Sequence, residues 1–60
     1  MKLEAIHHKV IFLLVAGNQT SVIAKKVKVS VSTIQRWQQD KDFNLALQKG
    51  FSKANGDAIN

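Results

Sequence analysis

The stretch from Asn18 to Gln39, NQTSVIAKKVKVSVSTIQRWQQ, decides the fold. Its first half predicts a short helix over about 20–27, with apolar residues on one side and lysines on the other. Its second half, VSTIQRWQQ, predicts another helix over 31–39, in which Ile34 and Trp37 are three residues apart and face the core. Only three residues separate the two helices, so a tight turn must join them.

The turn and the first of these helices carry further signals. Ser30 directly precedes VSTIQRW and predicts an N-cap, and Val29 before it can pack beneath the helix entry. Lys28 stands where such a turn usually has a positive φ angle, which costs a lysine about 1 kcal/mol or more, so the sequence leaves open whether Lys28 adopts it. Ala24 is small enough to let the following helix cross closely. The buried side of the helix is expected to hold Val22, Ile23 and Val27.

An apolar helix over about 3–16 precedes this stretch, and Gly17 is expected to end it. One face is expected to carry the residues that recur at helical spacing, Leu3, Ile6, Val10, Leu13 and Leu14. Ile11, Phe12 and Val15 fall outside that stripe, so the helix is apolar around more of its girth than a thin domain needs. This excess predicts contact with another helix or another subunit.

A polar break and a shorter helix follow the stretch. Asp40 or Asp42 can cap a helix over about 43–49, and Gly50 is placed to end it in the left-handed conformation that glycine tolerates. Residues 54–60 have no periodicity, which predicts a frayed tail.

Size and composition limit the possible functions. The 60 residues predict one domain over 1–53, all-α, a small three- to four-helix bundle with a helix-turn-helix. So small a domain has no room for a deep catalytic cavity, and the sequence has no nucleophile constellation or phosphate-binding glycine loop, so no enzyme is expected. There is no cysteine, and adjacent His7 and His8 point about 100° apart on a helix, which predicts surface or edge histidines and no metal or other cofactor. The longest apolar run is far short of the ~20 residues that span a bilayer, which fits a cytoplasmic protein.

The net charge of +5 is unevenly distributed. The four acids are Glu4, Asp40, Asp42 and Asp57, so the segment 5–39 has none. The cations inside that segment are Lys9, Lys25, Lys26, Lys28 and Arg36. A field of one sign favours a polyanionic partner, because neutralising phosphates releases condensed counterions. A merely soluble basic surface is the alternative that charge alone leaves open, and Lys9 is most simply a solvated charge.

The run IAKKVKVSVSTIQRW at 23–37 resembles the helix-turn-helix consensus in which an I-A pair, a G-V-S turn and an S-T-I-x-x-W recognition helix follow one another. QQDKDFNLAL at 38–47 resembles the helix that follows this motif in small-terminase-like and related phage or transposon-type DNA-binding proteins. Lys28 departs from the consensus, which has glycine there. The resemblance implies a homeodomain-like domain that places 31–39 in the major groove of double-stranded DNA, in phage packaging, transcriptional regulation or transposition.

The resemblance also implies which residues contact DNA. Base edges would be contacted by Val31, Ser32, Gln35, Arg36 and Gln39. Phosphates would be contacted by Thr20, Lys25, Lys26, Lys28, Ser30 and Thr33. The residue types fit, since arginine can bond O6 and N7 of guanine, and glutamine can bond N6 and N7 of adenine. Arg36 could instead stabilise the C-terminal dipole of its helix, while Val31 and Thr33 could instead pack at the helix entry.

A single recognition helix spans only a few base pairs, so a homo-oligomer, a dimer or larger, is expected through the helix over 3–16 or the segment 43–51. The alternative from another class is a protein–protein interaction adaptor, a basic helical module that docks an acidic or helical partner through Ile11, Phe12 and Val15. Neither reading involves a membrane or a small-molecule substrate.

Overall fold

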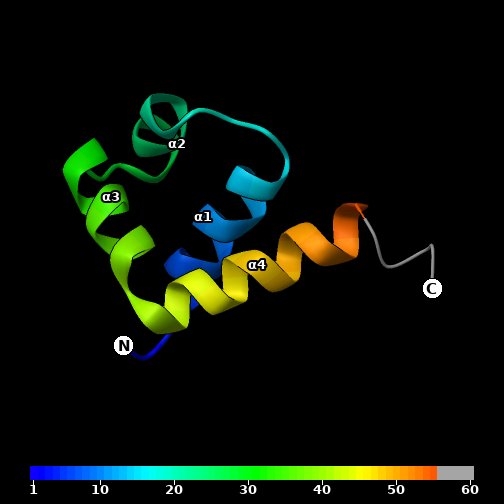
Figure 1. The fold of residues 1–60 in the computed structure, drawn as a ribbon. Helices are drawn as coiled ribbons and strands as arrows, with labels where there is room; N and C mark the ends of the chain where they lie inside the picture. Colours follow the sequence, from blue (N-terminus) through cyan, green and yellow to red (C-terminus); the bar gives the residue numbers. More distant parts are fainter. Residues whose placement is uncertain (56–60) are drawn as a thin grey trace.

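Four helices make up the residues that the computed structural model describes, 1–55. They are α1 (Ala5–Val15), α2 (Thr20–Val27), α3 (Val31–Gln39) and α4 (Lys41–Asn55), and the described part of the chain contains no strand. The all-α class is confirmed, as are the helices expected over 20–27 and 31–39. Helix α4 packs along α1, and its C-terminal end projects beyond the other helices (Figure 1).

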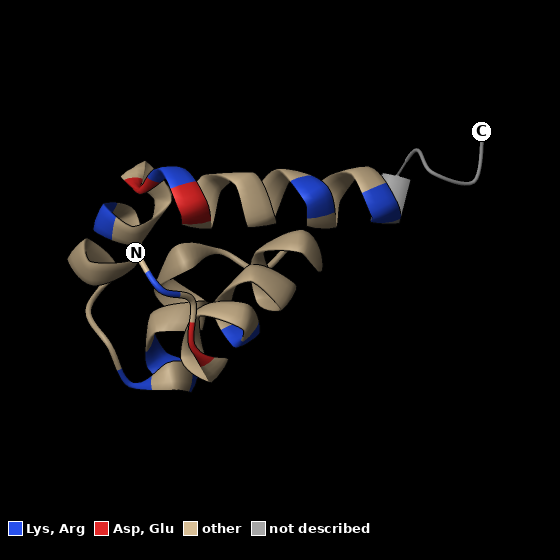
Figure 2. Cartoon of the chain, turned by 90° about the horizontal axis from the view of Figure 1, so that it is seen from below, with Lys and Arg blue, Asp and Glu red and all other residues tan. Residues whose placement is uncertain are grey.

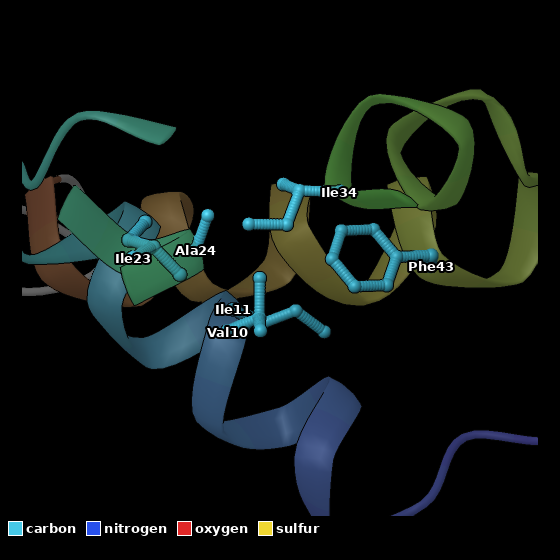
Figure 3. Packing of buried hydrophobic residues seen from close by; sticks show 6 residues of the cluster. All are labelled: Val10, Ile11, Ile23, Ala24, Ile34 and Phe43. Carbon is cyan, nitrogen blue, oxygen red and sulfur yellow. The ribbon is translucent and has the colours of Figure 1, made fainter. Parts of the chain in front are cut away.

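The core takes apolar side chains from all four helices (Figure 3). Its members are Val10 and Ile11 of α1, Ile23 and Ala24 of α2, Ile34 of α3 and Phe43 of α4. Four of them, Val10, Ile23, Ile34 and Phe43, are fully buried, and burial of one such side chain is worth about 1.5–3 kcal/mol. Ala24 lies in the core as expected. Val22 is 40% exposed, so the prediction that it lies on the buried side of α2 is wrong.

Helix α4 covers part of the apolar surface of α1 that lies outside the predicted stripe. Ile11 is 8% exposed and Val15 is half-buried, and both lie against Gly50 of α4: a methyl group on Gly50 would lie 2.8 Å from Cγ2 of Val15 and 3.7 Å from Cγ2 of Ile11. The expected end of the fourth helix at Gly50 is therefore wrong. Glycine is needed there for the close approach of two helices, and packing overrides its weak helix propensity, about 1 kcal/mol below alanine. Phe12, by contrast, is 70% exposed.

The beginning of α4 is fixed by Asp40. Its Oδ1 accepts hydrogen bonds from the backbone N–H groups of Asp42 (2.9 Å) and Phe43 (3.3 Å), which confirms one of the two expected caps. Desolvation favours the neutral acid, but these two bonds and the nearby amino group of Met1 outweigh it and lower the pKa of Asp40. At its other end α4 continues through Asn55, and the rest of the tail expected over 54–60 lies outside the described residues.

An aromatic cluster joins α1, α3 and α4. His7 is buried, its Nδ1 accepts the backbone N–H of Glu4 at 2.9 Å, and its ring meets Trp37 edge-on with centroids 4.6 Å apart. The ring of Phe43 lies 6.2 Å from that of Trp37 and 6.4 Å from that of His7, so the three rings are mutual neighbours; Trp37 is partly buried, as expected of a core residue. The surface position expected for His7 is therefore wrong, because the end of α3 covers it; His8 is exposed as expected.

Candidate nucleic-acid interface

The turn between α2 and α3 is fixed by backbone hydrogen bonds. Lys28 has φ 60° and ψ 46°, the left-handed conformation, which answers a question that the sequence leaves open. The backbone N–H groups of Lys28 and Val29 both donate to the carbonyl of Ala24, the latter at 3.0 Å. This arrangement satisfies a carbonyl at the end of α2 that would otherwise have no partner. The lysine is held in a costly conformation because these bonds require it.

Ser30 caps α3 as expected. Its Oγ accepts the backbone N–H of Thr33 at 3.1 Å and lies 2.8 Å from the Thr33 hydroxyl. The remaining N–H groups of the first turn have no partner inside the helix and point out of its N-terminus, where they suit an anion. Of the two predicted phosphate contacts here, Ser30 is exposed, while Thr33 is half-buried with its hydroxyl already bonded to Ser30.

The exposed face of α3 is polar and contains no carboxylate. At about 100° per residue, the five predicted base-contact residues fall within roughly 140° of the helix circumference. Ser32, Gln35, Arg36 and Gln39 are exposed, while Val31 is half-buried against the core. On the opposite side of the helix, Ile34 is 0% exposed and anchors α3 to the rest of the domain. The helix therefore presents these polar side chains outward on a fixed support.

The predicted phosphate contacts on α2 fall at its two ends. Thr20 is the first residue of α2 and is half-buried, whereas Lys26 and Lys28 lie at the other end, about 9–12 Å away at 1.5 Å per residue. Lys25 is exposed in the last turn as well. Lys26 and Lys28 line a shallow groove of about 310 Å³ together with Lys9 of α1. Sequence reasoning missed Lys9, because only the packing of α1 on α2 brings it there.

None of the described acidic residues belongs to α2 or α3, and Asp40 directly follows α3 as its C-cap. In Figure 2 the red segments lie before α1 and where α4 begins, and the ribbon of α2 and α3 carries blue and tan only. The ion pairs among the described residues both involve the amino group of Met1, 2.7 Å from Asp42 and 3.4 Å from Asp40. The lysines of α2 and Arg36 therefore have no carboxylate partner within the described part of the chain.

No three histidine or acidic residues of 1–55 gather in a group that could hold a metal ion. None of the described helices is long and apolar enough to cross a bilayer. No protein-family model, curated protein or solved structure matches this chain.

Proposed function

We propose that this protein binds double-stranded DNA through a helix-turn-helix made of α2, the turn at 28–30 and α3, with α3 entering the major groove. The observation that carries the proposal is the composition of the exposed face of α3, where Ser32, Gln35, Arg36 and Gln39 stand in water without any carboxylate. An acid on this face would repel phosphates and, as a hydrogen-bond acceptor, could not bond the acceptor atoms that predominate on the base edges, so its absence favours a polyanionic partner.

The dimensions of α3 suit the proposed position. An α-helix with its side chains is about 10–12 Å across, and the major groove of B-DNA is about 12 Å wide. Arg36 and Gln35 carry the donors for bidentate contacts to guanine and adenine, each worth about 1–3 kcal/mol of discrimination. Val31, half-buried at the helix entry, offers its outer methyl group to a thymine.

Backbone contacts would come from both ends of α2 and from the cap of α3. Thr20 lies at the N-terminus of α2, Lys25 and Lys26 lie in its last turn, and Lys28 and Ser30 lie in the turn. A helix lying in the major groove is flanked by two phosphate strands, and contacts separated along α2 help to fix its orientation without selecting sequence.

One copy of α3 is short for specific recognition. Its 9 residues extend about 13 Å, which is roughly four base pairs at 3.4 Å per step, so we propose that the protein acts as a homo-oligomer. Most of α1 is covered by α4, and the exposed large apolar side chains that could join copies include Phe12 of α1 and Leu45 of α4. The host process would be phage packaging, transcriptional regulation or transposition, as the resemblance at 23–47 implies.

The test is selection from random duplexes with the purified wild type, Arg36→Ala and Lys25→Ala. The wild type is expected to select two half-sites, and its affinity for any duplex should fall steeply between ~50 and ~200 mM salt because bound phosphates release counterions. Arg36→Ala should change the preferred sequence at one position of each half-site, whereas Lys25→Ala should weaken all duplexes alike. Identical effects of the two substitutions would remove the base-contact role of Arg36.

A flat response to salt would instead favour the adaptor. The surface expected for that role is not formed, however, since Ile11 is buried beneath α4 and Val15 is half-buried against Gly50. Phe12 is left as the exposed member of the three, and one side chain is far below the apolar patch that docking usually needs. The DNA-binding proposal is therefore the better supported of the two.

A further inference from the structure

Three lysines converge on one groove beside the turn. The groove is lined by Ala5, Ile6 and Lys9 of α1, by Lys26 and Val27 of α2, and by Lys28 of the turn. Lys9 stands one helical turn from Ala5 and Ile6, so all three lie on the same face of α1. All three lysines are exposed, and none forms an ion pair with a described residue.

Cations that line one groove together attract an anion, and water screens their mutual repulsion while the groove is empty. The dipole of α2 offsets part of this repulsion for Lys26, which lies in the last turn of that helix. Lys9 gains no comparable stabilisation from a helix dipole, because it lies in the middle of α1. An anion bound between the two helices would give Lys9 the charge partner that no described residue provides.

The floor of the groove suits an anion of small size. Ala5, Ile6 and Val27 are apolar, so the lysine stems can lie along them while the ammonium groups extend toward the opening. Apolar walls also lower the local dielectric, which strengthens the attraction between ammonium and phosphate. The volume, about 310 Å³, is ample for one phosphate group with its water.

The groove is continuous with the proposed DNA-binding surface. Lys28 belongs to both, and it is only two residues, at most about 7.6 Å between Cα atoms, from Ser30 at the cap of α3. With α3 in the major groove, the strand that passes the N-terminus of α3 would run toward this opening. We propose that the groove of Lys9, Lys26 and Lys28 binds a backbone phosphate of the same duplex, an inference that rests on the proposed function.

The test compares Lys9→Gln with Lys49→Gln, an exposed lysine of α4 that is no part of the groove. The slope of log affinity against log salt should decrease by about 1 for Lys9→Gln, with several-fold weaker binding to every duplex, and should not change for Lys49→Gln. Lys9→Arg should retain the wild-type slope, which separates lost charge from lost folding. Wild-type binding with an unchanged slope in Lys9→Gln would overturn this inference alone, whereas a wild type that binds no duplex would overturn the proposed function as well.

A second arm separates duplex phosphate from free phosphate. Inorganic phosphate is titrated into the ¹⁵N-labelled protein without DNA, and the amide signals of Ala5, Ile6 and Lys9 are followed. Weak shifts at millimolar phosphate that are abolished in Lys9→Gln are expected. Tight, saturating shifts combined with an unchanged salt slope would assign the groove to a free phosphate compound and overturn the duplex assignment.

Discussion

Lys28 holds a left-handed conformation that is unfavourable for any residue with a Cβ atom, at a cost of about 1–2 kcal/mol. The sequence leaves open whether Lys28 adopts it, because the residue after the second helix of such a motif usually has a positive φ angle and a lysine resists one. The benefit of a lysine there is its charge, which lies beside Lys9 and Lys26 in the groove. If the groove binds an anion as proposed, stability and anion binding compete at this one residue.

Lys28→Gly should raise the free energy of unfolding by roughly 1 kcal/mol, because glycine adopts a positive φ without the Cβ clash and this gain exceeds its greater freedom in the unfolded chain. Urea unfolding followed by circular dichroism measures the change. Lys28→Ala is the matched control: it removes the charge but keeps the Cβ atom, so it should bring no comparable gain. Equal stabilisation by both substitutions would mean that charge repulsion, and not φ, sets the cost.

At the scale of the helices, the contact between α1 and α4 depends on a missing side chain. The sequence predicts Gly50 as a helix end because glycine commonly occupies that position, but the other common role of glycine, a close helix crossing, depends on the residue opposite. That residue is Val15, which is 35 positions away, and periodicity within a single helix carries no information about it. The burial of Ile11 also depends on its contact with Gly50, so periodicity within α1 does not predict it either.

Gly50→Ala should lower the free energy of unfolding by about 1 kcal/mol. The added methyl would lie 2.8 Å from Cγ2 of Val15, and overpacking of about 1–3 kcal/mol exceeds the gain of about 1 kcal/mol in helix propensity. In a Val15→Ala background the same substitution should become stabilising, since the opposing methyl is gone. A double-mutant cycle by urea unfolding measures this reversal, and Ser52→Ala on the exposed side of α4 is the control. Destabilisation that persists in the Val15→Ala background would rule out this contact as its cause.

For the whole molecule, sequence periodicity predicts where α2 and α3 lie, and residues 31–39 are correct to the residue because Ser30 and Asp40 mark both ends. It does not predict the environment of His7 or Lys9, which depends on how α1 lies against α3 and α2. The surroundings of His7 and Lys9 are therefore set by tertiary packing, which periodicity does not predict. The exposed polar face of α3 can be predicted, because it depends on one helix and on one buried residue, Ile34.

The acid stability of the domain should depend on Asp40. Its pKa in the folded protein lies below the ordinary 3.8, so the stabilisation is complete above that pH and is lost as pH falls through the folded value. Urea unfolding between about pH 5 and pH 2 should show this loss in the wild type. Asp40→Asn should flatten the acid limb, because asparagine still caps α4 but does not titrate. Asp42→Asn is the control: it keeps the two backbone N–H groups that donate to Asp40, so it should retain most of the loss of stability at low pH. Identical pH curves for the wild type and Asp40→Asn would refute the role of Asp40 in acid stability.

The aromatic cluster has a practical consequence for experiments on this protein. Trp37 is its only tryptophan and tyrosine is absent, so intrinsic fluorescence reports a single indole. That indole packs against the rings of His7 of α1 and Phe43 of α4, and it points about 100° around α3 from Arg36. Emission should therefore change strongly when the three helices separate on denaturation and only slightly when a duplex occupies the outer face. A small fluorescence response to DNA would signify an undisturbed scaffold, and binding is better followed by a label on the duplex.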